Sequence, residues 1–124
     1  MIDFSNKSII KLKQESSENA YKVVGNQLID NEEIIAGFAS IRDRVVFTNK
    51  RIISVNVQGL TGTKVDYTSI PYNKIQLYSV ETAGTMDLDS ELDIWVAGVG
   101  KIRFELSGST DVVKISKVIS SFIL

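Results

Sequence analysis

Two different periods of hydrophobic residues divide the chain near residue 30. From residue 7 to 28 the apolar side chains recur at loosely helical spacing around a polar stretch, which predicts one or two short helices. After Asp30 the chain changes to short runs rich in valine and isoleucine, separated by turn residues about every ten positions. These runs predict seven antiparallel strands, at residues 32–39, 43–48, 51–57, 63–70, 73–83, 86–97 and 100–106.

Turn residues and a final helical stripe complete the expected fold. Residues 48–51 and 59–62 are predicted to form tight hairpin turns, because asparagine and glycine tolerate the backbone angles that such turns require. Beyond residue 109 the period is helical again, with Thr110 as the expected cap. The apolar stripe of this helix is Val112, Ile115, Ile119 and Phe122.

The expected architecture is therefore mainly β, or α+β by content. We predict a seven-stranded bent sheet or barrel that is capped by a C-terminal α-helix. Residues 1–28 form an N-terminal helical segment and residues 29–124 form the domain proper, and together they make one structural unit.

The alternation of apolar residues in the last two strands predicts how they pair. Their apolar faces must point to the same side of the sheet, and a three-residue loop at 98–100 achieves this. The predicted pairs are Val96 with Ile102, Ile94 with Phe104, Leu92 with Leu106, Trp95 with Arg103 and Asp93 with Glu105. The fourth is a cation–π pair, and the fifth is an unfavourable pair of like charges.

Composition narrows the range of functions. The 124 residues are 44% hydrophobic and 23% charged, which is typical of one ordinary globular domain. Fourteen basic and fifteen acidic residues give a net charge of -1, without the basic surplus that nucleic-acid binders carry. There is no cysteine and no histidine, so thiolate metal sites, cysteine nucleophiles and the ordinary general base are excluded. We expect no enzyme activity and no cofactor.

The chain carries no recognisable targeting or membrane segment. Its first residues lack a basic region followed by an apolar one, and the longest unbroken apolar run is residues 34–39. We therefore expect a cytoplasmic protein.

Four acidic residues alternate along the sixth predicted strand. Asp87, Asp89, Glu91 and Asp93 would line one face at steps of about 7 Å. One interpretation is a divalent-cation site or a carboxylate pair for hydrolysis, but a straight strand spreads its carboxylates apart and the calcium-loop spacing is missing. We instead expect an exposed polar face whose charges either stay solvated or meet basic residues, and a neighbouring subunit is one source of such residues, which makes the four positions a candidate interface.

The densest basic group consists of Arg42, Arg44, Lys50 and Arg51. Such a group is a candidate contact for an anionic lipid headgroup or a phosphate. The alternative is that these residues flank turns and prevent exposed strand ends from pairing wrongly.

Several segments resemble one known family. They are Ile41-Arg42-Asp43, residues 46–53 (Val-Phe-Thr-Asn-Lys-Arg-Ile-Ile), residues 58–62 (Gln-Gly-Leu-Thr-Gly), Ser69-Ile70-Pro71-Tyr72 and residues 80–92. This set closely resembles the bacterial pleckstrin-homology-like domain family. The resemblance implies a seven-stranded bent sheet with a C-terminal helix, a cytoplasmic protein without catalysis, and ring-like homo-oligomers. Phosphoinositide-binding pleckstrin-homology domains cluster lysines and arginines after their first strand, where this chain has only Arg42 and Arg44.

The expected function is therefore binding and assembly. A bent sheet with unpaired edge strands can extend between subunits, and a closed ring uses every such edge. The expected partner is a second copy of the chain, with a pentameric ring as one candidate, or another protein, but not nucleic acid. Binding to a membrane surface through the basic group is the alternative and is not favoured.

Overall fold

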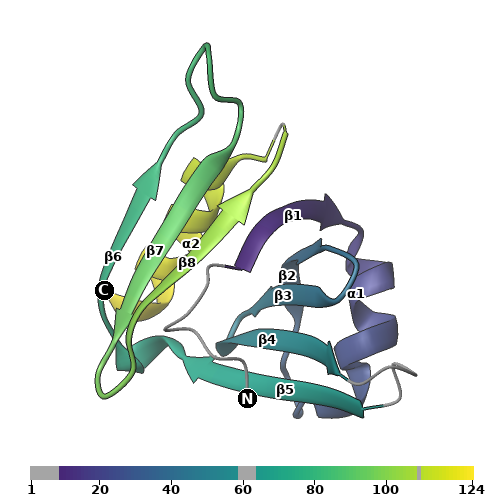
Figure 1. The fold of residues 1–124 in the computed structure, drawn as a ribbon. Coiled ribbons are helices and arrows are strands. Elements are labelled where there is room, and N and C mark those ends of the chain that lie inside the picture. The colour runs from purple at the N-terminus through teal and green to yellow at the C-terminus, as the bar shows by residue number, and fades with distance from the viewer. Residues whose placement is uncertain (1–8, 59–63, 109) are drawn as a thin grey trace.

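The computed structural model describes residues 9–58, 64–108 and 110–124 (Figure 1). The strands are β1 (Ile9–Glu15), β2 (Ile34–Ala39), β3 (Asp43–Thr48), β4 (Arg51–Gln58), β5 (Lys64–Pro71), β6 (Ile75–Glu81), β7 (Ser90–Val96) and β8 (Gly100–Leu106). The helices are α1 (Ser17–Val24) and α2 (Val112–Ile123), and the 3-10 turns are η1 (Gly25–Gln27) and η2 (Tyr72–Lys74). The predicted β fold with a C-terminal helix is confirmed, and each of the seven predicted strands has a counterpart.

One bent sheet contains all of these strands. Its order is β5-β4-β3-β2-β1-β8-β7-β6, so β5 and β6 are its two edges. Neighbouring strands are antiparallel except β1 and β8, which are parallel. The tight hairpin turn predicted at residues 48–51 is confirmed between β3 and β4, whereas the turn predicted at 59–62 lies outside the described residues. The sheet bends around its core without closing into a barrel (Figure 1).

Strand β1 corrects the prediction for the start of the chain. Helical spacing was expected through residues 7–28, but residues 9–15 form an eighth strand between β2 and β8. The short apolar run at its start fits either period. As a strand, this segment pairs with both β2 and β8 and so satisfies backbone groups of these two strands, which a helix in the same place would leave unpaired. The helical prediction holds for α1, where the Ser16 hydroxyl accepts a hydrogen bond from the Asn19 N–H at 3.1 Å. The division at residue 28 remains a prediction.

The bend encloses a central core between the sheet and α2. Its fully buried members include Leu12, Phe38, Phe47, Ile52, Leu92, Ile94, Phe104, Leu106, Ile115 and Ile119. A smaller cluster lies on the other side of β3 and β4, beneath α1, and consists of Ala20, Val24, Val46, Ile53 and Val55. The helix approaches closely because a Cβ on Gly37 would lie only 2.9 Å from the Ala20 Cβ. The β2–β5 half of the sheet therefore packs side chains on both of its faces.

Helix α2 covers the inner side of the other half, β6 to β8 (Figure 1). Its predicted stripe is buried at Val112, Ile115 and Ile119, while Phe122 is 40% exposed and stacks on Tyr72 with a 5.1 Å centroid distance. The expected cap Thr110 is wrong by one residue. The Asp111 carboxylate caps the helix by accepting a hydrogen bond from the Lys114 N–H at 3.1 Å.

The β7–β8 hairpin has the predicted loop length but a different register. Its three loop residues are 97–99, because Val96 pairs with Gly100, and Gly98 and Gly100 both adopt positive φ. The observed pairs include Leu92 with Phe104, Ile94 with Ile102, Asp93 with Arg103 and Trp95 with Lys101. All five predicted pairs are therefore wrong. The apolar faces of the two strands still point to the same side, because the predicted register differs from the observed one by an even number of residues.

Candidate functional site

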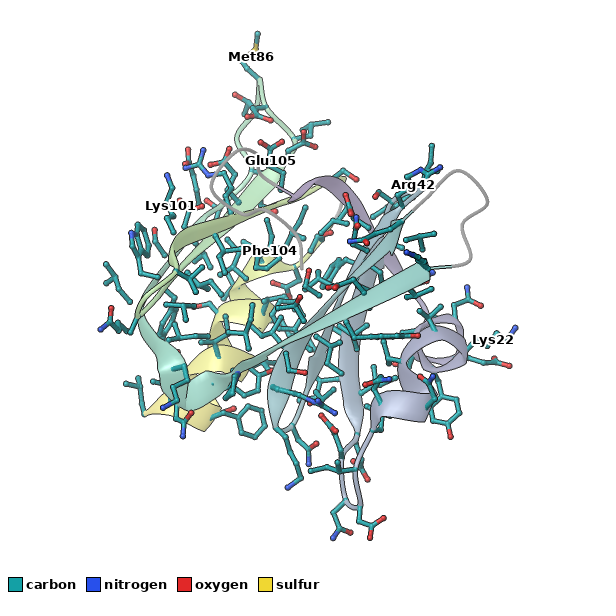
Figure 2. All side chains as sticks on the ribbon, turned by 60° about the horizontal axis from the view of Figure 1, so that its bottom comes forward. Lys22, Arg42, Met86, Lys101, Phe104 and Glu105 are labelled. Carbon is teal, nitrogen blue, oxygen red and sulfur yellow. The ribbon has the colours of Figure 1, made fainter. Side chains whose placement is uncertain are left out.

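No helix of the described chain covers the outer face of β6, β7 and β8. Strand pairing arranges nine residues there in three rows, which we call the open face: Leu77, Trp95 and Lys101; Ser79, Asp93 and Arg103; Glu81, Glu91 and Glu105. Figure 2 shows Lys101 and Glu105 on the outer side of the sheet and Phe104 in the interior. The open face is amphipathic, since Leu77 and Trp95 lie at one end and the three glutamates at the other.

Arg103 forms the ionic centre of the open face. Its Nε and Nη2 donate to the two carboxylate oxygens of Asp93 at 2.8 and 2.9 Å, and its Nη1 lies 3.6 Å from Glu91 Oε2. These hydrogen bonds and the charge of Asp93 raise the pKa of Arg103. The predicted register of β7 and β8 was wrong by two residues, so the sequence analysis placed Arg103 opposite Trp95. The structure has the bidentate pair with Asp93 in place of the predicted cation–π contact.

The third row places three glutamates directly opposite one another. Glu91 pairs with Glu81 on β6 and with Glu105 on β8. Burial, and then the charges of Glu81, Glu105 and Asp93, raise the pKa of Glu91, although Arg103 acts in the opposite direction. Like charges in directly opposed positions are unfavourable. The open face therefore has an excess of negative charge that the ion pairs of Arg103 with Asp93 and Glu91 do not neutralise.

The β6–β7 connection extends this acidic end beyond the sheet. The predicted strand over 86–97 begins only at Ser90, so Asp87 and Asp89 lie in the connection, and the expected inward-facing Leu88 is 67% exposed. The Asp87 carboxylate accepts a hydrogen bond from the Asp89 N–H at 3.0 Å. A hollow of about 330 Å³ lies between the connection and the sheet, lined by Glu81, Thr82, Gly84, Thr85, Met86, Asp87, Asp89 and Glu91. Across residues 9–58, 64–108 and 110–124, no three carboxylates converge in a way that would hold a metal ion.

The structure does not bring the predicted basic residues together. Arg42 and Arg44 lie at the β2–β3 end of β3, and Lys50 and Arg51 lie at its other end. Arg44 forms an ion pair with Glu15, and an Arg42 Nη1 donates to the Val57 carbonyl at 3.3 Å. Lys50 has an exposed side chain in the β3–β4 turn. Contact of these residues with lipid or another anion remains a prediction.

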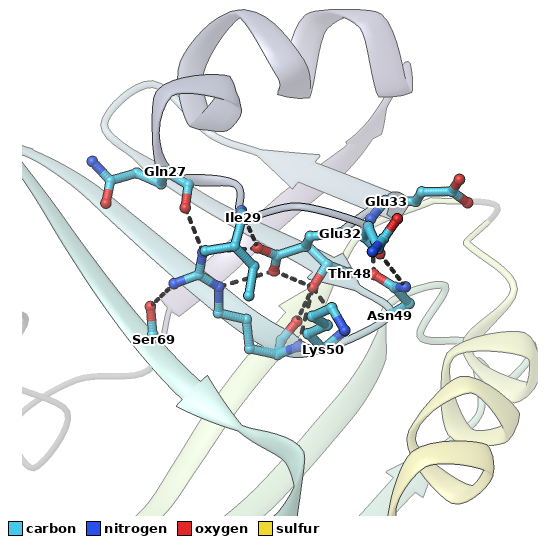
Figure 3. A network of polar contacts seen from close by, with 10 residues as sticks. Gln27, Ile29, Glu32, Glu33, Thr48, Asn49, Lys50 and Ser69 are labelled. Atoms are coloured by element: carbon cyan, nitrogen blue, oxygen red, sulfur yellow. Dashed lines mark hydrogen bonds and ion pairs between the residues drawn. The ribbon is translucent and has the colours of Figure 1, made fainter.

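Arg51 belongs to a polar network that the sequence did not predict (Figure 3). Its guanidinium donates to both Glu32 carboxylate oxygens at 2.9 Å, to the Gln27 carbonyl at 2.6 Å and to the Ser69 hydroxyl at 2.8 Å. The Thr48 hydroxyl also donates to Glu32, at 2.7 Å. We call Glu32, Thr48 and Arg51 the clasp, because they join the segment after η1 to the β3–β4 hairpin.

Hydrogen bonding in the clasp determines the ionisation of Glu32. Burial alone would raise its pKa, but the hydrogen bonds from Arg51, Thr48 and the Ile29 N–H outweigh that effect and lower the pKa from 4.5 to about 2. The Glu32 side chain has no solvent exposure. Arg51 therefore forms a structural ion pair with Glu32 in this fold.

Comparison with known proteins establishes the family. A model of the bacterial PH domain matches residues 3–123. The chain belongs to the bacterial PH domain family. The resemblance to a pleckstrin-homology-like family is thereby confirmed.

Solved structures and a curated relative agree with this membership. A DUF1696 family protein with a pleckstrin-homology domain from Shewanella loihica PV-4 is 42% identical, with a TM-score of 0.79 over 92% of this chain and 98% of the other. The pleckstrin homology domain from Shewanella amazonensis SB2B is 41% identical, with a TM-score of 0.66 over 96% and 93%. The uncharacterized protein YjqA of Bacillus subtilis (strain 168) is 54% identical over 71 residues, which is 57% of each chain.

A more distant structure supports the fold alone. The PH-domain-containing protein from Exiguobacterium sibiricum 255-15 is 22% identical, with a TM-score of 0.72 over 90% of this chain and 61% of the other. Within the described residues of this bacterial PH domain, no helix is long and apolar enough to cross a membrane.

Proposed function

We propose that this domain is a cytoplasmic, non-catalytic binding module that assembles with copies of itself into a ring, through the open face and the adjoining edge strand β6. One observation carries the proposal. Among residues 9–58, 64–108 and 110–124, one half of the sheet has both faces packed, whereas nothing covers the outer face of the other half, which ends in the edge strand β6. Such a half-covered sheet favours a partner, because its apolar residues and its backbone edge are both available.

The composition of β6 supports its use as an interface. In its seven residues the only charged side chain is Glu81, and there is no proline or lysine. The other edge, β5, begins with Lys64 and ends with Pro71, which are residues that discourage strand addition. Beside the β6 edge, Leu77 is 56% exposed on the open face. Strand β6 therefore lacks the usual protection of an exposed edge.

The chemistry of the open face supports binding without catalysis. The chain contains no histidine and no cysteine, so a hydrolytic mechanism would have to use its carboxylates. Asp93 is held by two hydrogen bonds from Arg103, and although Glu81 and Glu91 line the hollow beside the β6–β7 connection, no three carboxylates of the described residues converge there to hold a metal ion. Charged groups in this arrangement are suited to recognising a partner of opposite charge.

The test is the mass of the protein in solution. Multi-angle light scattering after size exclusion should give a discrete multiple of the 13.7 kDa chain at micromolar concentration. Leu77→Lys places a charge beside the β6 edge and should reduce that mass. Val99→Lys is the matched control, because Val99 is also half exposed (51%) but lies in the β7–β8 turn. A monomeric wild type, or equal effects of the two variants, would count decisively against the proposal.

A further inference from the structure

We infer that the groove between α1 and the segment leading into β2 binds a short segment of another protein, in which a bulky apolar side chain is flanked by lysine or arginine. The groove has a volume of about 380 Å³. Sites for small ligands span about 300–1,000 Å³, so the groove is large enough for a bulky side chain. Helix α1 lies on the β2–β5 half of the sheet, whereas the open face belongs to β6, β7 and β8 (Figure 1). The inference is therefore independent of the proposed self-assembly.

The floor of the groove is apolar and rests on the smaller core cluster beneath α1. Leu28 and Ile34 line the groove, and both are half-buried and pack against that cluster. The close approach of Ala20 to Gly37 brings α1 directly against β2. The apolar floor is therefore already formed in the free protein, and a preformed site lowers the entropic cost of binding.

Tyr21 forms an aromatic wall of the groove. This residue is 60% exposed, yet its ring lies against Gly25, where an added Cβ would be only 3.0 Å from the ring carbon Cζ. The absence of a side chain at Gly25 leaves room for the ring in this position. Tyrosine is one of the residue types that contribute most to protein interfaces, above all when it lies beside an apolar pocket. Tyr21 is therefore the expected anchor for an apolar side chain of the partner.

The charge around the groove indicates the chemistry of the partner. Among the described residues, every charged side chain that lines the groove is a glutamate. The Glu32 carboxylate is already paired with Arg51 in the clasp. Glu18 and Glu33 are exposed, and no basic side chain of the described chain forms an ion pair with either of them. Two negative charges beside an apolar floor favour an apolar side chain with basic neighbours and disfavour an acidic or phosphorylated segment.

Selection from a phage-displayed library of random peptides, with the wild-type protein as bait, tests this specificity. The enriched peptides should share a bulky apolar residue with lysine or arginine on both sides. A selection that enriches no peptide, or only peptides without this pattern, would overturn the inference.

Fluorescence polarisation with the most enriched peptide then locates its binding site. Tyr21→Ala should weaken binding about tenfold or more, because it removes the aromatic wall. Glu18→Gln with Glu33→Gln should weaken binding several-fold and remove most of its dependence on salt concentration. All three positions are exposed, so these variants should fold, which circular dichroism and thermal melting can verify.

Two control variants make matched changes elsewhere on the surface. Ile41→Ala shortens an exposed apolar side chain between β2 and β3, and Glu81→Gln with Glu105→Gln removes two carboxylates from the open face. Both controls should leave the affinity for the peptide unchanged. Folded groove variants that bind the peptide as tightly as the wild type, or controls that lose as much affinity as they do, would overturn the inference. The mass of the protein in solution tests the proposed function separately, so the two failures are distinguishable.

Discussion

The clasp makes a quantitative prediction about stability and pH. Glu32→Gln keeps the shape of the side chain but removes the charge that holds Arg51, so it isolates the contribution of that ionisation. The folded pKa of Glu32 lies at about 2, below the ordinary value of 4.5. A carboxyl group whose pKa is lowered by folding contributes stability above its unfolded pKa, and this contribution is lost as the pH falls through the folded pKa.

The magnitude follows from the shift. Each pKa unit corresponds to about 1.4 kcal/mol, so ionised Glu32 contributes about 3 kcal/mol to the free energy of unfolding at pH 7. The same two pKa values imply that about 2 kcal/mol of this contribution is already lost at pH 3. The Glu32 side chain has no solvent exposure, but its partner Arg51 is 20% exposed, so screening by solvent reduces this contribution somewhat.

Urea unfolding of wild type and Glu32→Gln between pH 7 and pH 3 measures this effect. The difference in free energy of unfolding between the two proteins should be about 2 to 3 kcal/mol at pH 7 and should shrink as the pH falls. Glu33→Gln, at an exposed neighbouring glutamate, should show a small difference throughout. A difference for Glu32→Gln that stays constant over this pH range would refute the reasoning.

Three further substitutions test the packing around the sheet, each by urea unfolding. Gly37→Ala should lower the free energy of unfolding by about 1 to 3 kcal/mol, because the new methyl group would lie 2.9 Å from the Ala20 Cβ, and adding Ala20→Gly should recover part of the loss. Asp111→Ala should cost about 1 kcal/mol by removing the cap of α2, and a fully retained stability would argue against that cap. Phe104→Ala should cost about 3 to 5 kcal/mol, whereas Lys101→Ala on the outer side of the same strand should change stability little; equal effects would contradict the register of β8.

Local patterns were sufficient for most of the fold. Alternating apolar residues located the strands, since a half-buried strand needs period two, and the stripe of Val112, Ile115 and Ile119 located α2. The run at the start of β1 was too short to distinguish the two periods. Its conformation depends on pairing with β2 and β8, two strands distant in the sequence, and a local pattern of residues carries no information about such partners.

The site was predicted less completely, because its contacts depend on register and on distant segments. The acidic interface was expected on one continuous strand, but Asp87 and Asp89 lie in a connection, and Glu91 and Asp93 share Arg103. The Arg51 pair with Glu32 joins residues nineteen positions apart in the chain. A signal was present, since Arg51 follows a tight turn and Glu32 precedes the strand that pairs with this hairpin, but the spacing does not specify a partner.

Trp95 offers the most direct measurement of whether the open face is an interface. It is the chain's single tryptophan and lies half buried on the open face beside Leu77. Diluting the assembled protein while recording fluorescence and mass should shift the Trp95 emission to longer wavelength and increase its quenching by acrylamide, in step with the loss of mass. Emission and quenching that stay the same while the oligomer dissociates would show that assembly uses another surface.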